Sequence, residues 1–374
     1  MVSSWAGIKQ PMDEDFRMDE KATETLDMRI IDDFHGKVLP VLRCVACGEA
    51  RPEFLEGRVN ESFSEGFWHH SLRCKECGAM YPVTRDYIPV VWSPEMKKYL
   101  EGESGEDSPL TANMTIYDKF SSEYKETIRV DPEIPQRLGR AVERIGSHAG
   151  LDVNSGEIRQ IDIGCGPGHT LEGLKGFGMQ QFGLDVSLSN LRNTRRDTGA
   201  MVVCGDAVML PFADKSFQIV TSSAVLHHLL DWQAGLREFC RICDKQGGVI
   251  LDSEPSKDNL NWGLLARFVW RCRQPVFKVM SLFSKSKFVF RDDRDFNRNL
   301  VAEIHNLPGR GFGPEDIEQI FSEQGFAAEI IPSPDTELKP KGRPNWKLAV
   351  LHLLSGHNPW HPKYGQFMAI AVRA

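Results

Sequence analysis

The chain has 374 residues, of which 41% are hydrophobic and 26% charged, and its formal net charge is −7 at pH 7. These values are ordinary for a globular protein, and the negative charge argues against a surface that binds nucleic acid over its whole area. Because no run of about 18 apolar residues lacks a charge and the start has no apolar signal segment, we expect no transmembrane helix and a cytoplasmic location with reduced cysteines.

The first part of the chain divides into a tail and a small domain with cysteines. Residues 1–38 are acidic and rich in methionine, with weak periodicity, so we expect a tail or a loose helix. Residues 39–92 contain short β-type runs around two C-x2-C pairs, each followed directly by glycine. Four thiolates at this spacing suit a tetrahedral Zn²⁺ with no open position, which favours a structural zinc ribbon over four unrelated core cysteines. The predicted ligands are Cys44, Cys47, Cys74 and Cys77.

A larger domain follows a linker. Residues 93–115 include a stretch rich in Gly, Ser and acidic residues, which is typical of a linker. Residues 116–374 alternate β-branched runs with helical stretches, and this pattern predicts a parallel sheet with helices on both faces. The last two runs alternate like a closing antiparallel pair. The expected strands are 157–164, 181–187, 200–206, 217–224, 247–254, 326–332 and 364–374.

The turn after the first of these strands, IDIGCGPGHT at residues 161–170, is rich in glycine. Such a turn lets a ligand approach the backbone and the N-terminus of the next helix. Its GxGxG spacing differs from the GxGxxG of dinucleotide sites. Because ligands of open α/β sheets bind beyond the carboxyl ends of the strands, the residues that follow the strands are interpreted together. Asp185 is suited to accept hydrogen bonds from a ribose, Asp206 from an exocyclic amine, and Leu210 is suited to cover a ring.

The segments IDIGCGPGHTLEGL, LDVS, GDAVMLPFADKSFQIVTSSAVLHHLLDW and REFCRICDKQGGVIL together resemble the class I S-adenosylmethionine-dependent methyltransferases, over about residues 116–255 and more loosely to the end. The resemblance implies a Rossmann-like α/β fold with a seven-stranded mixed sheet, and S-adenosylmethionine as cofactor. It also implies that Asp162 orients the amino group of the cofactor, that Asp185 binds the ribose, and that Tyr117 and Tyr124 form a lid. The residues implied at the methionine part are Gly164, Gly166 and Gly168, and those at the adenine are Asp206, Ala207 and Leu210.

The cysteine domain has a resemblance of its own. The segments VLRCVACG and LRCKECGAMYPVTRDYIPVVW are similar to the small zinc-ribbon subunit that activates several tRNA and release-factor methyltransferases. This resemblance implies a ribbon that stabilises the catalytic domain and shapes the access of substrate. The remaining cysteines are interpreted as structural thiols, and they are Cys165, Cys204, Cys240, Cys243 and Cys272.

Methyl transfer needs a general base only where the nucleophile must lose a proton. His227 and His228 follow the fourth expected strand, Glu254 follows the fifth, and His305 lies further along the chain in the expected lid. We predict His227 and His228 as the catalytic residues, and a purely structural role for each histidine is the alternative.

The segment of about residues 256–310, between the fifth and sixth expected strands, predicts a helical cap over the pocket. Residues 259–291 contain seven Arg or Lys residues and no acidic residue. Apolar residues such as Leu265, Phe268 and Val269 recur at helical spacing. Three interpretations remain open: the apolar face packs on the core, the cap contacts an anionic substrate or a lipid surface, or it contacts an RNA backbone.

These patterns predict an S-adenosylmethionine-dependent methyltransferase that acts on a small-molecule or lipid-linked metabolite, with an anionic acceptor and peripheral membrane contact as further options. The alternative is a tRNA, rRNA or protein methyltransferase that recognises its substrate through the zinc ribbon. A third hypothesis is a non-enzymatic scaffold that binds the cofactor. The sequence predicts neither the acceptor atom nor the oligomeric state.

Overall fold

The computed structural model describes residues 28–57, 68–100, 108–119, 121, 133–272, 293–333, 338–339, 343–344, 346–357 and 366–374. The predictions for residues 1–27, for Tyr124 and for the basic residues from Arg273 to Arg291 lie outside these ranges. Within the described ranges, no helix combines the length and the apolar character needed to cross a bilayer.

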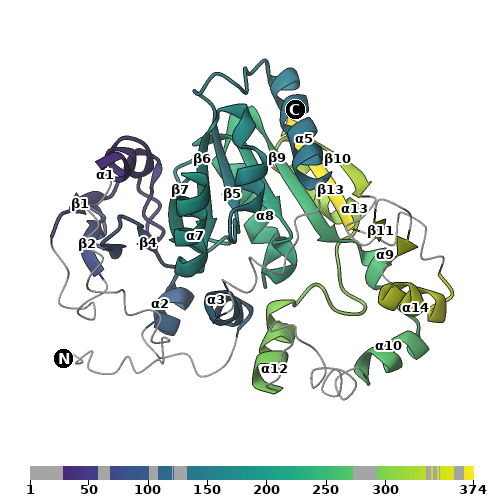
Figure 1. The fold of residues 1–374 in the computed structure, drawn as a ribbon. Coiled ribbons are helices and arrows are strands. Elements are labelled where there is room, and N and C mark those ends of the chain that lie inside the picture. Colours follow the sequence, from purple (N-terminus) through teal and green to yellow (C-terminus); the bar gives the residue numbers. More distant parts are fainter. Residues whose placement is uncertain are drawn as a thin grey trace.

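The largest sheet has eight strands in the order β10-β13-β9-β8-β5-β6-β7-β4 (Figure 1). Neighbours from β9 to β4 run parallel, whereas β13 runs antiparallel to both β9 and β10. The mixed α/β sheet and its seven expected strands are therefore confirmed. These strands are β5 (Arg159–Ile163), β6 (Gln180–Asp185), β7 (Met201–Gly205), β8 (Phe217–Ser223), β9 (Cys243–Pro255), β10 (Phe326–Ser333) and β13 (Gln366–Arg373).

An eighth strand, β4 (Val90–Val91), widens this sheet by one position beyond the seven that were predicted. Val90 pairs with Cys204 and Val91 pairs with Gly205 of β7, in parallel register. Both valines are buried. The sequence assigns them to the zinc ribbon alone, because a run of two residues is too short to show the alternation of a strand. The edge of the large sheet is thus formed by the domain that carries the four predicted zinc ligands.

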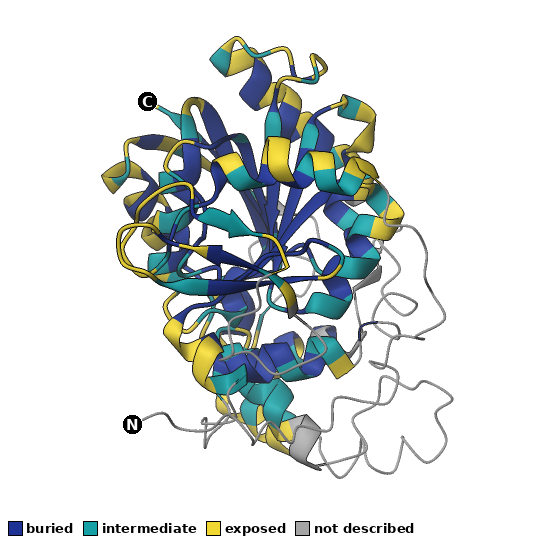
Figure 2. Cartoon of the chain, turned by 90° about the vertical axis from the view of Figure 1, so that its left-hand side faces the viewer, coloured by how far each residue is buried: buried dark blue, intermediate teal, exposed yellow. Residues whose placement is uncertain are grey.

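Helices cover both faces of the sheet, and the strands between them are buried (Figure 2). Leu138, Val142 and Ile145 of α5 form one core cluster with Ile219 of β8. A larger cluster contains residues of α8 and α13, which contact each other. The helices around the sheet are α5 (Glu133–Ala149), α6 (His169–Gly173), α7 (Leu188–Thr198), α8 (Trp232–Ile242) and α13 (Pro314–Glu323), with short 3-10 turns η4 (Lys175–Phe177) and η5 (Leu226–His228).

Local signals fix where these helices begin and end. The Ser187 side chain accepts the N–H of Asn190 at the start of α7, and the Asp231 side chain accepts the N–H of Ala234 at the start of α8. Helix α7 ends at Gly199, whose φ of 77° suits a residue without Cβ. Because α7 and α8 begin just after β6 and β8, the caps also fix the loops at the carboxyl ends of these strands.

The N-terminal domain is a three-stranded antiparallel sheet with short helical turns (Figure 1). Phe34 and Val38 lie within the segment predicted as a tail, yet both are buried in the main core cluster. Leu42 forms a β-bridge with Phe212, which lies after β7. The elements are α1 (Met28–Asp33), a π-helical turn η2 (Phe34–Val38), η3 (Leu39–Val41), β1 (Glu53–Leu55), β2 (Trp68–Arg73) and β3 (Met80–Thr84). The apolar spacing of Phe34 and Val38, one helical turn apart, accounts for their burial.

The segment predicted as a linker contains most of two helices, α2 (Pro94–Leu100) and α3 (Pro109–Lys119). The two helices contact each other, and α3 also contacts α7 and η5. Helix α3 therefore lies at the carboxyl ends of the parallel strands, near the predicted site.

The cap contains helices that pack on different partners. Helix α12 contacts α3, whereas α10 contacts α14, and the two pairs lie apart in the lower part of the molecule (Figure 1). On α10, Leu264 is 88% exposed and Phe268 is 64% exposed, and Leu265 and Val269 are exposed as well. The helix is where the spacing predicts it, but this apolar face does not pack on the core, so the first of the three interpretations is wrong for the described part of the cap. The elements are α9 (Lys257–Leu260), α10 (Leu264–Arg271), α12 (Asp293–Ala302), α14 (Trp346–Leu354), β11 (Leu338–Lys339) and β12 (Arg343–Pro344).

Candidate active site

A pocket opens beyond the carboxyl ends of β5, β6 and β7, where an open α/β sheet binds its ligands. Helix α3 and the turn η5 form its other walls. The pocket brings together seven predicted residues: Tyr117, Gly164, Gly166, Asp185, Asp206, Ala207 and His228. Four other predicted residues, Asp162, Gly168, Leu210 and His227, do not line it.

The glycine-rich turn follows β5, and its glycines either leave the backbone bare at the pocket or allow close packing of the next helix. Gly164 has φ +68°, and a Cβ there would lie 2.5 Å from Val225 Cγ2, so no side chain fits. Gly166 has φ +48°, and a Cβ there would meet nothing within 4 Å, because this residue faces the open pocket. Gly168 lies deeper, at the N-cap of α6 and against Thr194. The first two glycines thus leave a bare backbone for a ligand, and the third sets the packing of the helix.

Asp185 ends β6 and holds the glycine turn in place. Its Oδ2 accepts the Gly166 N–H at 2.8 Å and its Oδ1 accepts the Ser187 N–H at 2.9 Å. Each oxygen retains a second lone pair for a ligand. Burial raises the pKa of Asp185 to about 6, although these backbone hydrogen bonds favour the carboxylate. The carboxyl group is therefore fixed and aimed at the pocket.

Asp162 lies behind this site, within β5. It is 2% exposed and accepts a hydrogen bond from the Thr221 hydroxyl at 2.7 Å. Burial, and then the charge of Asp185, raise the pKa of Asp162 to about 7. Because Asp162 does not line the pocket, any action on a ligand would pass through an intervening group.

The loop after β7 forms the opposite end of the pocket. Asp206 accepts the Val208 N–H at 3.0 Å, and burial raises its pKa. Ala207 and Val208 line the pocket beside it. Leu210, predicted to cover a ring, is fully buried in the core instead, and its N–H is donated to Glu238. Val208 lines the pocket and offers the apolar surface that was expected from Leu210.

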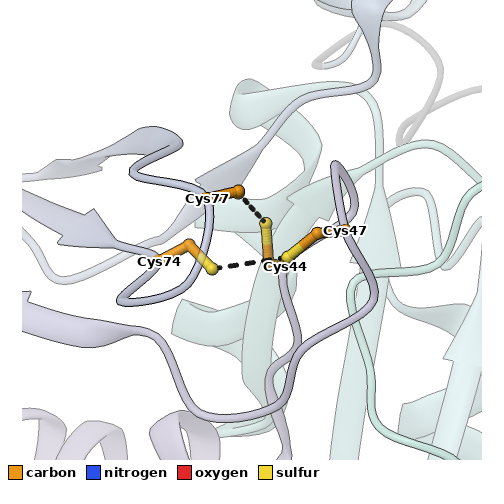
Figure 3. Close-up of side chains that lie close together, drawn as sticks. All are labelled: Cys44, Cys47, Cys74 and Cys77. Carbon is orange, nitrogen blue, oxygen red and sulfur yellow. Dashed lines mark hydrogen bonds between the residues drawn. The ribbon is translucent and has the colours of Figure 1, made fainter.

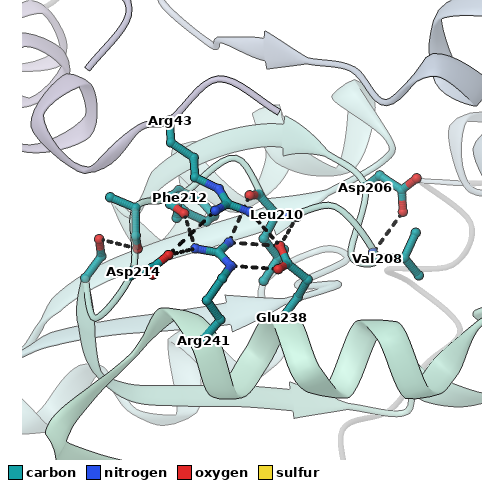
Figure 4. A network of polar contacts seen from close by, with 10 residues as sticks. Arg43, Asp206, Val208, Leu210, Phe212, Asp214, Glu238 and Arg241 are labelled. Carbon is teal, nitrogen blue, oxygen red and sulfur yellow. Dashed lines mark hydrogen bonds and ion pairs between the residues drawn. The ribbon is translucent and has the colours of Figure 1, made fainter. Parts of the chain in front are cut away.

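A charged network ties this loop to the cysteine domain (Figure 4). Glu238 of α8 accepts both the Leu210 N–H and a hydrogen bond from Arg43, which precedes the first predicted zinc ligand. Arg241 donates to Glu238 and to the carbonyl oxygens of Leu210 and Phe212. The same side chains therefore join the cysteine domain, α8 and the loop that ends at the pocket.

Four pocket residues come from the segment predicted as a linker: Glu95 of α2, and Pro109, Leu110 and Asn113 of α3. Asn113 donates its side-chain N–H to the Pro109 carbonyl at 2.7 Å, and its buried Oδ1 has no hydrogen-bond partner. A buried acceptor without a partner in a pocket wall points to a donor on the ligand. Asn113 precedes Tyr117 by one helical turn, so the two side chains share a face of α3. This spacing is the sequence signal that could have identified Asn113 as a pocket residue.

The wall opposite the glycine turn carries the two predicted catalytic histidines. His228 Nε2 faces the Tyr117 hydroxyl at 3.3 Å, and His228 Nδ1 lies 2.9 Å from the Ala302 carbonyl oxygen. A carbonyl oxygen only accepts, so Nδ1 carries the hydrogen of the neutral ring and Nε2 has the lone pair. Burial and the neighbouring His227 lower the pKa of His228, which keeps it neutral.

His227 is buried behind its neighbour. Its Nδ1 lies 2.9 Å from Glu254 Oε2, and its Nε2 lies 3.4 Å from Glu303 Oε2. Although burial opposes it, the Glu254 and Glu303 charges raise the pKa of His227. Only His228 of the pair thus lines the pocket. His305, the other candidate, donates its backbone N–H to the His227 carbonyl and supports the turn.

The four predicted zinc ligands converge in the N-terminal domain, with side chains that point toward one another (Figure 3). The Sγ atoms of Cys44 and Cys77 are 3.6 Å apart, and those of Cys47 and Cys74 are 3.5 Å apart. Hydrogen bonds from the Tyr81 hydroxyl and from backbone N–H groups outweigh burial and lower the pKa of Cys44 to about 7. The set is suited to hold a tetrahedral metal ion through thiolates.

The other cysteines do not form a second cluster of this kind among the described residues. Cys165, Cys204, Cys240 and Cys243 are buried, as the structural interpretation predicts, whereas Cys272 is exposed. Cys240 lies in the last turn of α8 and Cys243 begins β9, so the pair spans a helix end rather than one helix face.

Comparison with known proteins identifies a domain that contains part of the pocket, from Gly164 to Asp231. Residues 161–251 match the family model of a methyltransferase domain. A demethylmenaquinone methyltransferase of Corynebacterium urealyticum is 35% identical over 141 residues, which cover 37% of this chain and 58% of the relative. A protein of the same name from Staphylococcus aureus is 29% identical over 184 residues, covering 45% of this chain and 67% of the relative.

Among solved structures, a magnesium protoporphyrin IX methyltransferase from Synechocystis PCC 6803 with bound SAH is similar at a TM-score of 0.36 and 17% identity, covering 70% of this chain and 96% of that chain. At this TM-score the likeness adds nothing to the fold described above. The two relatives each match less than half of this chain. The family model matches residues 161–251 and therefore does not include the cysteine domain.

Proposed function

We propose that the chain, whose residues 161–251 match a methyltransferase domain, transfers the methyl group of S-adenosylmethionine to a small-molecule or lipid-linked acceptor. One observation carries the proposal. The glycine turn, Asp185, Asp206 and the Tyr117–His228 pair line a single pocket, so a cofactor and an acceptor can meet in it.

The pocket fits the cofactor at each of its parts. The bare backbone at Gly164 and Gly166 accommodates the methionine part, and Asp185 has a lone pair on each oxygen for the two ribose hydroxyls. Asp206 and Ala207 line the same pocket, and we assign them to the adenine. The unpartnered Oδ1 of Asn113 supplies an acceptor for a cofactor N–H group. When bound, S-adenosylmethionine supplies an electrophilic methyl group whose transfer needs alignment and exclusion of water.

His228 and Tyr117 form the acceptor end of the pocket in this proposal. The fixed tautomer of His228 directs a lone pair into the pocket, and Tyr117 contacts the same nitrogen. Leu229 and Leu230 line the pocket next to them, and Leu230 is 64% exposed. We propose that His227 and His228 both act on the acceptor: His228 contacts the acceptor, and His227 holds His228 in position.

Exposed apolar surface supports a lipid-linked acceptor. Among described residues, seven of the nine exposed large hydrophobic side chains lie on the contacting helices α10 and α14. Apolar helix faces with neighbouring Arg and Lys residues are suited to a lipid surface. The two curated relatives carry the name demethylmenaquinone methyltransferase, which favours the same broad class of acceptor. Methylation of RNA or protein, with the cysteine domain as reader, is the alternative.

The cysteine domain is proposed to bind one structural Zn²⁺ through Cys44, Cys47, Cys74 and Cys77. The proposal is supported by the matching turns of the two C-x2-C pairs. Gly48 donates its N–H to the Cys44 carbonyl and Gly78 to the Cys74 carbonyl, and both glycines have positive φ. Because a zinc site of four thiolates needs reduced cysteines, we also propose a reducing, cytoplasmic location.

The proposed function is tested by the transfer of isotopically labelled methyl groups from S-adenosylmethionine into cell extract that is separated into RNA, protein, lipid and small-polar fractions. Label in the lipid or small-polar fraction is expected. Label confined to RNA or protein would favour the alternative, and binding of the cofactor without any transfer would favour a scaffold. An Asp185→Ala variant should lose the transfer and serves as the negative control.

A further inference from the structure

A second group of metal-binding side chains lies beside the pocket. One nitrogen each of His227 and His228 and a carboxylate oxygen of Glu303 lie within 4.8 Å of one another. The histidines belong to η5, and Glu303 directly follows α12 of the cap. The group is therefore assembled from segments that are far apart in the sequence, and His228 connects it to the pocket.

Both imidazoles are held through the same ring atom. His227 Nδ1 is hydrogen-bonded to Glu254 Oε2 at 2.9 Å, and His228 Nδ1 donates to the Ala302 carbonyl oxygen at 2.9 Å. Glu254 also accepts the backbone N–H groups of Val225, Leu226 and His227, and these bonds fix the position of its carboxyl group. Histidines that bind metals commonly donate their second ring N–H to a carboxylate or a carbonyl in this way. The Nε2 atoms are thus the ones that can face a shared ligand, and at His228 this ligand would replace the Tyr117 hydroxyl, which lies 3.3 Å from Nε2.

The spacing and the charge of the group both suit a dication. The distance of 3.4 Å between His227 Nε2 and Glu303 Oε2 exceeds that of a normal N–H···O hydrogen bond. It falls within the separation of about 3.3 to 3.6 Å between two ligands that bind one tetrahedral metal ion with bonds of about 2.0 to 2.2 Å. Glu254 is fully buried and the Glu303 side chain is 25% exposed. Two carboxyl side chains therefore lie against the pair of imidazoles, and a dication would balance the charge of both carboxylates.

We propose that His227, His228 and Glu303 bind a divalent transition-metal ion of the zinc class, with the remaining coordination position open toward the pocket. Two imidazoles and one carboxylate are a ligand set that such ions accept, and three protein ligands leave room for a substrate oxygen. The inference rests on the proposed function and deepens it, because it names the acceptor class as a molecule with a hydroxyl or enol oxygen.

The proposed metal ion would act on the hydroxyl oxygen of the acceptor. The ion would lower the pKa of an acceptor hydroxyl beside it, and the proton passes to solvent. The oxygen then forms a bond to the methyl carbon, the bond between that carbon and sulfur breaks, and its electron pair remains on the now neutral sulfur. His228 thereby acts on the acceptor through the ion instead of taking the proton itself.

The test counts metal ions on the full-length chain after dialysis against micromolar zinc chloride. Wild-type protein should bind two zinc ions per chain, one in the cysteine cluster and one in the new site. Glu303→Gln, which keeps the size of the side chain, should bind one. Glu318→Gln serves as the matched control, because Glu318 is an exposed glutamate on α13, and it should bind two. Wild-type protein that binds one zinc ion, with no difference from Glu303→Gln, overturns the proposal.

A cobalt titration gives a second readout that is independent of activity. Thiolate ligands produce intense charge-transfer bands with Co²⁺, whereas imidazole and carboxylate ligands produce weak visible bands alone. Wild-type protein should show both phases, and Glu303→Gln should lose the weak phase or require at least tenfold more Co²⁺ for it. Glu303 does not line the cofactor pocket, so calorimetry with S-adenosylmethionine reports separately on the proposed function.

Discussion

Replacement of Asp185 by asparagine tests the cofactor site most directly. Each carboxylate oxygen of Asp185 accepts one backbone N–H, from Gly166 at 2.8 Å and from Ser187 at 2.9 Å. In Asp185→Asn the amide nitrogen must face one of these two donors, whichever way the side chain is turned. The variant therefore loses one internal hydrogen bond, the charge, and at least one of the two charge-assisted hydrogen bonds that we propose between Asp185 and the ribose of the cofactor.

A hydrogen bond to a charged group contributes about 1.5 to 3 kcal/mol. The loss of one to the ribose thus predicts S-adenosylmethionine binding that is weaker by about 10-fold to 150-fold, at about 1.4 kcal/mol for each factor of ten. Isothermal titration calorimetry with S-adenosylmethionine measures this loss, and thermal unfolding checks that the variant is folded.

A matched control is available on the surface. Asp152 accepts the N–H of Asn154, two residues further on, at 3.0 Å, in the way that Asp185 accepts the N–H of Ser187. Asp152 is exposed and does not line the pocket, so Asp152→Asn should leave the affinity unchanged. An unchanged affinity in a folded Asp185→Asn variant would refute the assignment of Asp185 to the ribose.

Three further predictions concern pH, stability and lipid. The pKa values of about 6 for Asp185 and about 7 for Asp162 mean that both are protonated in acid, so the affinity for the cationic cofactor should rise as pH rises from about 5 to about 8. A flat calorimetric profile contradicts this. Arg137→Ala leaves the buried Asp252 without its ion pair and should lower the free energy of unfolding by about 3 to 5 kcal/mol in denaturant titrations. Arg144, also on α5, forms an exposed ion pair with Glu329, so Arg144→Ala should lower the free energy of unfolding by less than about 1 kcal/mol. Equal losses in the two variants would refute the claim that burial makes the Arg137–Asp252 pair the more important one. Phe268→Ser should reduce co-sedimentation with anionic phospholipid vesicles, whereas Met28→Ser, at another exposed apolar residue, should not.

The strands and the cofactor end of the pocket were predictable because their signals are local. β-branched runs marked all seven expected strands, and the glycine spacing marked the turn whose Gly164 has no room for a side chain. Asp185 and Asp206 could be found because parallel strands bring their carboxyl ends to one edge. The cluster of four cysteines was also predictable, because the repeated C-x2-C spacing is a local signal in the sequence.

The parts that escaped prediction depend on partners distant in sequence. Strand β4 is recognisable only through its pairing with β7, and Asn113 only through the position of α3 above the strands. Helical spacing located α10 but could not tell that Leu264 and Phe268 stay exposed, because the helix that α10 contacts, α14, lies some eighty residues further along the chain. The His227–Glu303 contact joins η5 to the cap, and neither residue carries a motif for it.

The pairing of β4 with β7 has a consequence for any attempt to separate the two domains. Without β4, the backbone of β7 from Cys204 to Gly205 would present unpaired N–H and C=O groups at the edge of a long apolar sheet. Such edges recruit strands from other molecules. A shortened chain that begins after Trp92 is therefore expected to aggregate even if its catalytic residues are intact. In this protein the cysteine domain covers the edge of the sheet at β7 and thereby prevents self-association there. This role does not depend on which substrate the enzyme methylates.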